Sequence, residues 1–175
     1  MLFEVKDCPY NKKMTRLKML LYLILIPNHN FYFLCEKIKI MLEIKEIKPS
    51  ETLDLRHRIL SPNKSIDSII LAEDDLGQHF GLFKEAQLIA VISLFIENDV
   101  AQFRKFATET AEQNKGYGSI LLNRVIEEAI ENNVKNLWCN ARITALSFYE
   151  KFGFEVVSEK WITKDVEYVK MERTF

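Results

Sequence analysis

The sequence predicts an α+β domain built on a mixed sheet with helices on its faces. Alternating apolar residues from Leu42 to Ile47 indicate a first strand. A nearly unbroken apolar run at 88–96 is typical of a central strand that is covered on both faces. From Gly118 onward, apolar residues recur with the period of a helix. Strands in the first half, followed by alternating strands and helices, indicate this fold class.

One helix interrupts the strands of the first half. Ser50 is expected to cap it, and Ser61-Pro62-Asn63 is expected to end it near residue 60. Residues 64–78 mix apolar and polar side chains and are expected to form a short helix or a loop. The strands expected after this segment span 79–84, 88–96 and 100–108.

The second half begins with an amphipathic helix that Asn132-Asn133 ends. A strand is expected at 136–140, followed by a helix that Thr144 caps and that Gly153 ends in the left-handed conformation. Two further strands, at 154–157 and 165–173, are expected to complete the sheet.

Composition limits the possible functions. The chain has 175 residues and a formal net charge of −1. It lacks the basic excess of a dedicated nucleic-acid-binding protein, so any anion site must be local. Cys8, Cys35 and Cys139 show neither paired nor metal-ligand spacing, so we expect no metal site and a reducing, cytoplasmic compartment. Cys139 lies in an apolar stretch, where a small buried side chain is favoured over a reactive thiol.

Residues 1–40 differ from the rest of the chain. A basic flank precedes the apolar run 19–26, which is far shorter than the roughly 20 residues that span a bilayer. The flank resembles that of a secretory signal, but no small-residue cleavage site follows. We expect Met41 to be the natural start, residues 1–40 to be an extension outside the native protein or outside the fold, and 41–175 to be the domain. A signal or membrane-surface segment and an ordinary extension are the alternatives.

Two glycines lie where the strand 100–108 joins the amphipathic helix. Gly116 and Gly118 allow the backbone to approach a ligand closely and leave N–H groups at the helix N-terminus unpaired. Such N–H groups, together with the helix dipole, form an anion site suited to a pyrophosphate. Lys115 can add a positive charge, and the Gln113 amide can add a donor. On the glycines alone, a turn without a ligand is favoured, and the spacing matches neither a P-loop nor a dinucleotide-binding fingerprint.

The motif Gln113-x-x-Gly116-x-Gly118 resembles the acetyl-CoA pyrophosphate loop of the GNAT N-acetyltransferases. The later segment Ala145–Phe154 resembles the second signature of that family, A-x-x-F/L-Y-x-x-x-G-F. The preceding segment Arg104–Thr108 is similar to the strand that leads into the loop. Because both motifs occur in order and on the expected elements, the domain is identified as a member of this superfamily.

The resemblance implies a GNAT fold, in which a mostly antiparallel sheet is splayed at its centre between the strands 100–108 and 136–140. The acyl donor, acetyl-CoA, would lie in that opening, with its pantetheine arm on backbone groups of Phe106 and Thr108. Tyr149 matches the tyrosine that protonates the departing thiolate, although it could merely pack beside Phe148. The residues implied to bind the rest of the donor are Gln113, Asn114, Lys115, Gly116, Tyr117, Gly118 and Asn140.

Two departures from the family pattern concern the chemistry. Gln102 stands where many relatives carry a glutamate general base, and it cannot accept a proton usefully. Glu97, Asp99 or a water chain are alternatives, although a solvated turn charge is the favoured interpretation of both acids. Arg142 stands where many relatives carry asparagine.

The implied reaction is transfer of an acetyl group to a primary amine of a small molecule, peptide or protein. Transfer of a longer acyl group, or a CoA-binding sensor with lapsed catalysis, are the alternatives. Arg56, His57 and Arg58 either contact an acidic group of the acceptor or form an exposed helix face, whereas His79 is expected to be structural. We expect no nucleic-acid partner and no membrane association, and an exposed sheet edge would allow a homodimer.

Overall fold

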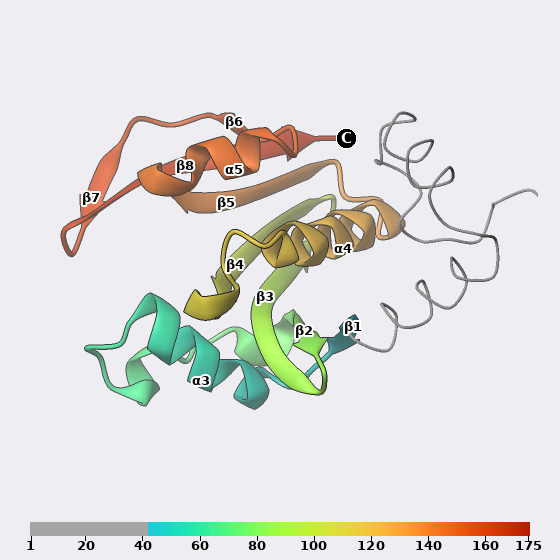
Figure 1. The fold of residues 1–175 in the computed structure, drawn as a ribbon. Coiled ribbons are helices and arrows are strands. Elements are labelled where there is room, and N and C mark those ends of the chain that lie inside the picture. Colours follow the sequence, from blue (N-terminus) through green and yellow to red (C-terminus); the bar gives the residue numbers. More distant parts are fainter. Residues whose placement is uncertain (1–41) are drawn as a thin grey trace, which may run out of the picture. The chain divides into compact units, whose positions relative to one another are not determined.

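A computed structural model describes residues 42–175, and the expected extension at 1–40, with Cys8 and Cys35, lies outside the described residues. Residues 42–175 form one unit around a single eight-stranded sheet (Figure 1). Its strands are β1 (Leu42–Glu46), β2 (Gln78–Lys84), β3 (Gln87–Glu97), β4 (Val100–Thr108), β5 (Asn136–Arg142), β6 (Glu155–Val156), β7 (Trp161–Thr163) and β8 (Val166–Thr174). They lie in the order β1-β2-β3-β4-β5-β8-β6, with β7 paired to β8.

All strand pairs are antiparallel except β4 and β5, so the expected mixed sheet is confirmed. A two-residue turn joins β2 to β3, and Glu85 and Ala86 adopt positive φ angles of 49° and 69° there. This geometry matches the twist of the two flanking strands. The apolar run predicted for a central strand is buried from Ile89 to Leu94, with β2 and β4 on either side.

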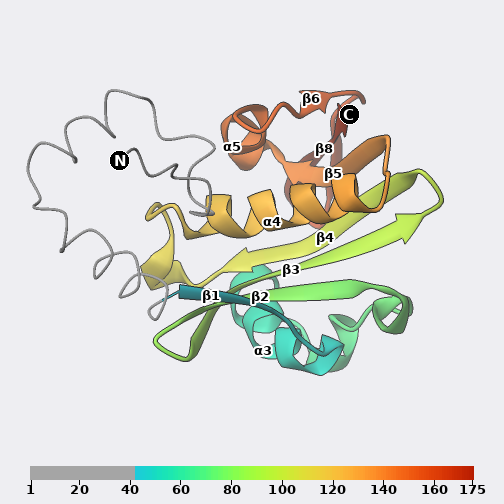
Figure 2. The same cartoon turned by 90° about the vertical axis from the view of Figure 1, so that its right-hand side faces the viewer.

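Helices cover both faces of the sheet (Figure 2). The helix α3 (Pro49–Leu60) packs against β3 and β4 on one face, where Leu55 meets Val91 and Ala107. On the other face, α4 (Tyr117–Glu131) and α5 (Leu146–Glu150) cover the larger apolar cluster. Neighbouring residues of β3 point to opposite faces, so its apolar run contributes to both clusters.

The predicted caps are wrong at two helices. Pro49 is the first residue of α3 and Lys48 is its N-cap, so Ser50 lies inside the helix. The Glu51 carboxylate accepts a bond of 2.7 Å from the Lys48 N–H, and the fixed φ of proline suits the first helical position. Thr144 caps no helix, because it lies in a 3₁₀ turn, Ile143–Ala145, that leads directly into α5. Gly153 has the expected left-handed conformation, with φ at 78°.

Cys139 is a buried core residue, as the favoured interpretation held. Burial raises the pKa of its thiol to about 12, so it stays protonated and inert near neutral pH. His79 is also buried, on β2, and its structural role is confirmed by the bonds described below.

Candidate functional site

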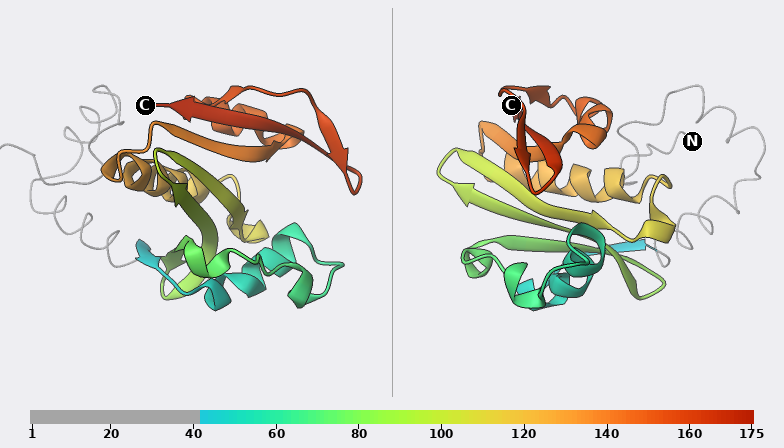
Figure 3. Two further views of the ribbon diagram at one scale, coloured as in Figure 1. Left: turned by 180° about the vertical axis from the view of Figure 1, so that it is seen from behind. Right: turned by 90° about the vertical axis from the view of Figure 1, so that its left-hand side faces the viewer.

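The two parallel strands at the centre of the sheet separate after a short paired segment. Pairing between β4 and β5 covers three residue pairs only, Val100 with Asn136 to Gln102 with Trp138. Beyond them both strands continue, to Thr108 and Arg142, without pairing to each other. Figure 3 shows from behind that they diverge toward β7 and the loop after α3. The resemblance predicted this separation between these two strands.

A bulge in β4 redirects the backbone at the separation. The β3–β4 register shifts between Val91 and Ser93, and Lys105 adopts a φ of 55° at that level. Past the bulge, the Glu109 N–H donates to the Ile89 carbonyl at 2.8 Å, so odd-numbered residues face β3. Because alternate backbone groups of an antiparallel strand point to opposite edges, those of Phe106 and Thr108 face the side that β5 has left.

The loop from Gln113 to Gly118 presents a series of amide groups. Within residues 42–175, the N–H groups of residues 114–119 have no hydrogen-bond acceptor, and the first later bond is from Ile120 N–H to the Gly116 carbonyl at 3.2 Å. Asn114 and Gly116 both adopt left-handed conformations, with φ at 60° and 86°. Left-handed residues before a helix N-terminus turn successive N–H groups to one side, which suits an anion.

The two glycines of this loop have different roles. A Cβ atom at Gly116 would meet no heavy atom within 4 Å, so this glycine provides the left-handed conformation in open space. A Cβ atom at Gly118 would lie 3.3 Å from the Phe106 ring and 3.6 Å from Thr108 Oγ1. Gly118 therefore allows the start of α4 to approach the end of β4 closely.

The charged and amide side chains of the loop have partners within the protein. The Gln113 side-chain amide donates to the Thr108 carbonyl at 3.0 Å and so ties the loop to β4. Lys115 Nζ lies 3.3 Å from the Glu112 carboxylate, which also accepts from Lys84 at 3.1 Å. The loop thus carries a carboxylate between two lysines, and its unpaired amides are its main anion-binding groups. Tyr117 is partly buried, beneath the Lys84 ammonium, whose nitrogen is 5.5 Å from the ring centroid.

Tyr149 lies in an aromatic group that links α5 to β4. Its ring centroid is 5.7 Å from that of Phe103, 5.1 Å from Phe148 and 6.2 Å from Phe154. Its hydroxyl has no hydrogen-bond partner in the described part of the chain. Burial raises the pKa of this phenol above its ordinary value, an effect that the nearby Arg142 charge partly offsets. The hydroxyl therefore stays protonated at neutral pH and can donate a proton.

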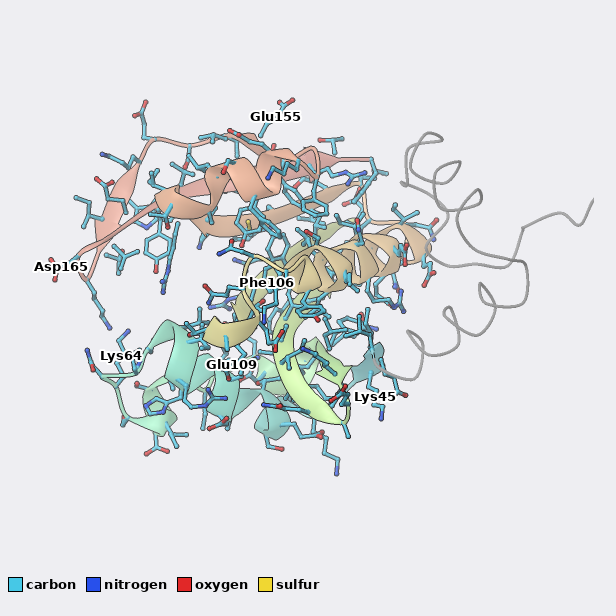
Figure 4. The ribbon with its side chains drawn as sticks, in the orientation of Figure 1. Lys45, Lys64, Phe106, Glu109, Glu155 and Asp165 are labelled. Atoms are coloured by element: carbon cyan, nitrogen blue, oxygen red, sulfur yellow. The ribbon has the colours of Figure 1, made fainter. Side chains whose placement is uncertain are left out.

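Phe106 connects this aromatic group to the loop. Its ring centroid is 6.0 Å from that of Phe148, and Figure 4 labels it beside the beginning of α4. Asn140 is exposed on β5, beyond the last residue that pairs with β4. The predicted donor-site residues are thus all on the segments that border the separation. Asn140 lies across it from the loop, and its side chain points to the α3 face because its neighbours Cys139 and Ala141 are buried on the other face.

The candidate general bases on the turn before β4 lie far from this region. Asp99 pairs with Lys135 at 2.9 Å, and Glu97 is exposed at the end of β3. At about 3.3 Å per strand residue, Asp99 is roughly 20 Å from Phe106. Both are solvated turn charges, as the favoured interpretation held, and Gln102 lies within the paired segment.

The three basic residues of α3 all have partners, and Arg56 fits neither interpretation from the sequence. Its side chain is fully buried and donates from Nη1 to both oxygens of Asp74, at 2.9 and 2.8 Å. The neighbouring His57 bonds to the Lys64 carbonyl at 2.7 Å. Arg58, which is exposed, pairs with Asp54 at 3.0 Å and Glu109 at 2.6 Å.

The Arg56 network joins α3, the following loop and the sheet. Arg56 Nη2 donates to Ser93 Oγ at 2.6 Å and to His79 Nδ1 at 3.2 Å. Because a guanidinium only donates, His79 Nδ1 accepts, and its Nε2–H donates to the Asp74 carbonyl at 2.7 Å. The tautomer of His79 is thus set by its partners. This network holds the segment between α3 and β2 against the sheet.

The sequence motifs do not identify two cations that lie near the separation. Lys105 lies on the β4 bulge, and Arg142 ends β5 with a bond of 3.3 Å from Nη2 to the Leu60 carbonyl. Sequence periodicity does not reveal a bulge, so nothing marked Lys105. Arg142 was visible only as a departure from the family pattern.

Two further properties concern residues 42–175 alone. Within that range, none of the helices has both the length and the apolar character needed to cross a bilayer. Nor does that range contain three His, Cys, Asp or Glu side chains grouped as a metal ion would need.

Comparison with known proteins identifies the family. Residues 50–175 match the family described as acetyltransferase (GNAT) domain. A Bacillus subtilis (strain 168) protein named "Uncharacterized N-acetyltransferase YitI" is 32% identical over 128 residues, which cover 68% of this chain and 86% of that protein.

Solved structures share the fold at low sequence identity. The ribosomal-protein-S18-alanine N-acetyltransferase from Escherichia coli has a TM-score of 0.67 and 20% identity, covering 77% of this chain and 94% of that chain. A GNAT family acetyltransferase from Elizabethkingia anophelis, solved with acetyl-CoA bound, has a TM-score of 0.62 and 17% identity, covering 77% and 98%. The chain therefore belongs to the GNAT acetyltransferase family and is an acyl-CoA-dependent acetyltransferase.

Proposed function

We propose that the protein transfers an acetyl group from acetyl-CoA to a primary amine by direct attack. The observation that carries this proposal is the set of six consecutive N–H groups, residues 114–119, without acceptors in the described part of the chain. They follow a 3₁₀ turn, Thr110–Glu112, that comes after the end of β4, where β4 and β5 are no longer paired. A diphosphate would be held by these amides, and the pantetheine arm would extend along β4 past Thr108 and Phe106.

Positioning and electrostatics are the expected contributions of the protein to the chemistry. The amine nitrogen attacks the thioester carbon, a C–N bond forms and the C–S bond breaks. The Phe106 N–H faces the opening and would stabilise the negative charge on the thioester oxygen, a contribution worth about 10²–10³ in rate. Tyr149 would give its proton to the leaving thiolate, and the proton lost by the amine would go to solvent.

Gln102 is consistent with an acceptor that reaches the site as a neutral amine. No carboxylate stands on β4 in the described structure, because Gln102 occupies the expected position and Asp99 is paired with Lys135. Deprotonation by water before attack then suffices, and the rate should follow the fraction of neutral amine. The acyl group is proposed to be acetyl, and a longer chain is an outcome that the test below can reveal.

The test is thiol release from acetyl-CoA by the full chain with a panel of primary amines. Release that requires an amine, with the acetylated amine detected by mass spectrometry, is expected. Butyryl-CoA and octanoyl-CoA in the same assay measure the preference for chain length. Thermal stabilisation by acetyl-CoA with no turnover of any amine would favour a CoA-binding sensor instead.

A further inference from the structure

Lys105 on β4 and Arg142 on β5 lie on opposite sides of the opening between these strands. Lys105 is three residues beyond Gln102, the last β4 residue that pairs with β5. The same step from its partner Trp138 leads to Ala141, and Arg142 is the next residue. The two cations therefore lie three and four residues past the last β4–β5 pair, on the two strands that border the opening.

Both side chains lie on the face of the sheet that α3 covers. Along β5, Cys139 and Ala141 are buried in the cluster beneath α4 and α5, so Arg142 points to the opposite face. Its bond to the Leu60 carbonyl, at the end of α3, agrees with this placement. Along β4, Phe103 and Phe106 pack in the cluster beneath α4 and α5, and Lys105 lies at the bulge between them. Burial lowers the pKa of Lys105, and the charges of Arg56, Arg104 and Lys64 lower it further, while Asp74 partly offsets them, as expected for a side chain on the α3 side.

The carboxylates of this region are already paired with other residues. Asp74 binds Arg56, and Glu73 lies 3.8 Å from Arg104. Within residues 42–175, neither Lys105 nor Arg142 has a carboxylate within ion-pair distance. A partly buried cation without a counter-ion is disfavoured by desolvation, and an anionic ligand compensates this cost.

We propose that the acceptor is a primary amine that carries a carboxylate or phosphate group, which Lys105 and Arg142 bind on the α3 face. Because the donor would occupy the opposite side of the opening, this contact would direct the amine toward the thioester. The net charge of the chain is only −1, so the preference arises from these two residues and not from a long-range field. This inference rests on the proposed function, since it concerns the acceptor of the same reaction.

The experiment uses pairs of amines that differ only in the acidic group. One pair is a dipeptide and its C-terminal amide, whose α-amines ionise alike, and another is an aminoalkyl phosphate and the matching aminoalcohol. For the full chain, kcat/KM with acetyl-CoA and the dissociation constant in the presence of CoA are measured for each member. We expect the acidic member of at least one pair to be favoured about tenfold or more in both quantities.

Variants assign that preference to the two residues. Lys105→Gln and Arg142→Gln should each reduce the ratio of acidic to neutral acceptor, Lys105→Arg should retain it, and Lys105→Glu should reverse it. The matched control is Lys45→Gln on β1, away from the opening in Figure 4, for which the ratio should be unchanged. An equal response to both members of every pair, no binding of either, or a ratio that Lys105→Gln leaves unchanged would overturn the inference. Turnover of neutral amines alone would still support the proposed function. Selective binding of the acidic amines without turnover would support the anion-binding role of Lys105 and Arg142 but not the proposed acetyl transfer.

Discussion

At the scale of single residues, the ring and the hydroxyl of Tyr149 are expected to have different roles, in packing and in catalysis. Its ring packs among Phe103, Phe148 and Phe154, and its hydroxyl bonds to no residue of the described chain. Tyr149→Phe should therefore keep the free energy of unfolding nearly unchanged. It should lower kcat about 10²-fold, the range of general acid catalysis, with little change in the dissociation constant of acetyl-CoA. Unchanged turnover would leave Tyr149 a packing residue only.

The pH dependence of turnover follows from the raised pKa of Tyr149. A phenol whose pKa lies above its usual value of about 10 stays protonated throughout the neutral and mildly alkaline range. The rate should rise with pH as the acceptor amine loses its proton. At no pH under about 10 should a further increase in pH lower the rate. A pH–rate profile that descends below pH 9 in the unsubstituted protein, but not in Tyr149→Phe, would contradict the raised pKa of Tyr149.

Gly116 provides a left-handed conformation that other residues adopt at a cost. Gly116→Ala should destabilise the fold by about 1–2 kcal/mol, because a Cβ atom is disfavoured at a φ of 86°. It should also weaken acetyl-CoA binding, since relaxing this φ would redirect the neighbouring amides. Gly77 adopts an extended conformation and lies outside the loop, so Gly77→Ala, which meets the Phe95 side chain, controls for stability loss alone. Equal loss of acetyl-CoA affinity in both variants would argue against a role for the left-handed conformation of Gly116 in acetyl-CoA binding.

At the scale of elements, the buried Arg56–Asp74 pair attaches the segment after α3 to the sheet. Arg56→Met should destabilise the fold by about 3–5 kcal/mol, because it leaves the buried Asp74 carboxylate without its cation. Arg58→Met removes two surface ion pairs, to Asp54 and Glu109, from the same helix and should cost about 1 kcal/mol or less. Urea unfolding at neutral pH measures both changes, and similar values for the two variants would refute the importance of the buried pair.

The elements themselves were largely predictable, and the errors lie at their ends. The strand 100–108 and the helix beginning near Gly118 were predicted within one residue, because periodicity and glycine mark them directly. Serine favours the N-cap position, but Pro49 begins the helix one residue before Ser50, so Lys48 is the N-cap. The strand β7 was missed, since a strand of three residues is too short to show a period.

Arg56 shows what sequence periodicity cannot provide. Its partners Asp74, His79 and Ser93 are 18, 23 and 37 residues away, and each belongs to another element. A basic residue on an amphipathic helix is usually solvated, so no pattern in the helix indicates that this one is buried. The same limit applies to Lys105, because a bulge depends on the register between two strands and not on either strand alone.

At the scale of the whole molecule, the proposed donor site depends on how three features meet. The separation of β4 from β5, the bulge at Lys105 and the loop at 113–118 lie in one continuous stretch of the structure. The motifs predicted the loop and the separation through the family resemblance. The structure adds the directions in which the backbone groups of β4 and the cationic side chains point. On this basis we propose that donor and acceptor bind on opposite faces of one opening.

The most direct test is an amide-resolved NMR titration of the full chain with acetyl-CoA. We expect saturable shifts that are largest at the N–H groups of residues 114–119, with smaller shifts at Phe106 and Thr108. Acetylated pantetheine, which lacks the diphosphate, should move the β4 resonances and leave residues 114–119 nearly unshifted. Saturable binding of acetyl-CoA that leaves the amides of 114–119 unperturbed would show that the diphosphate does not bind this loop.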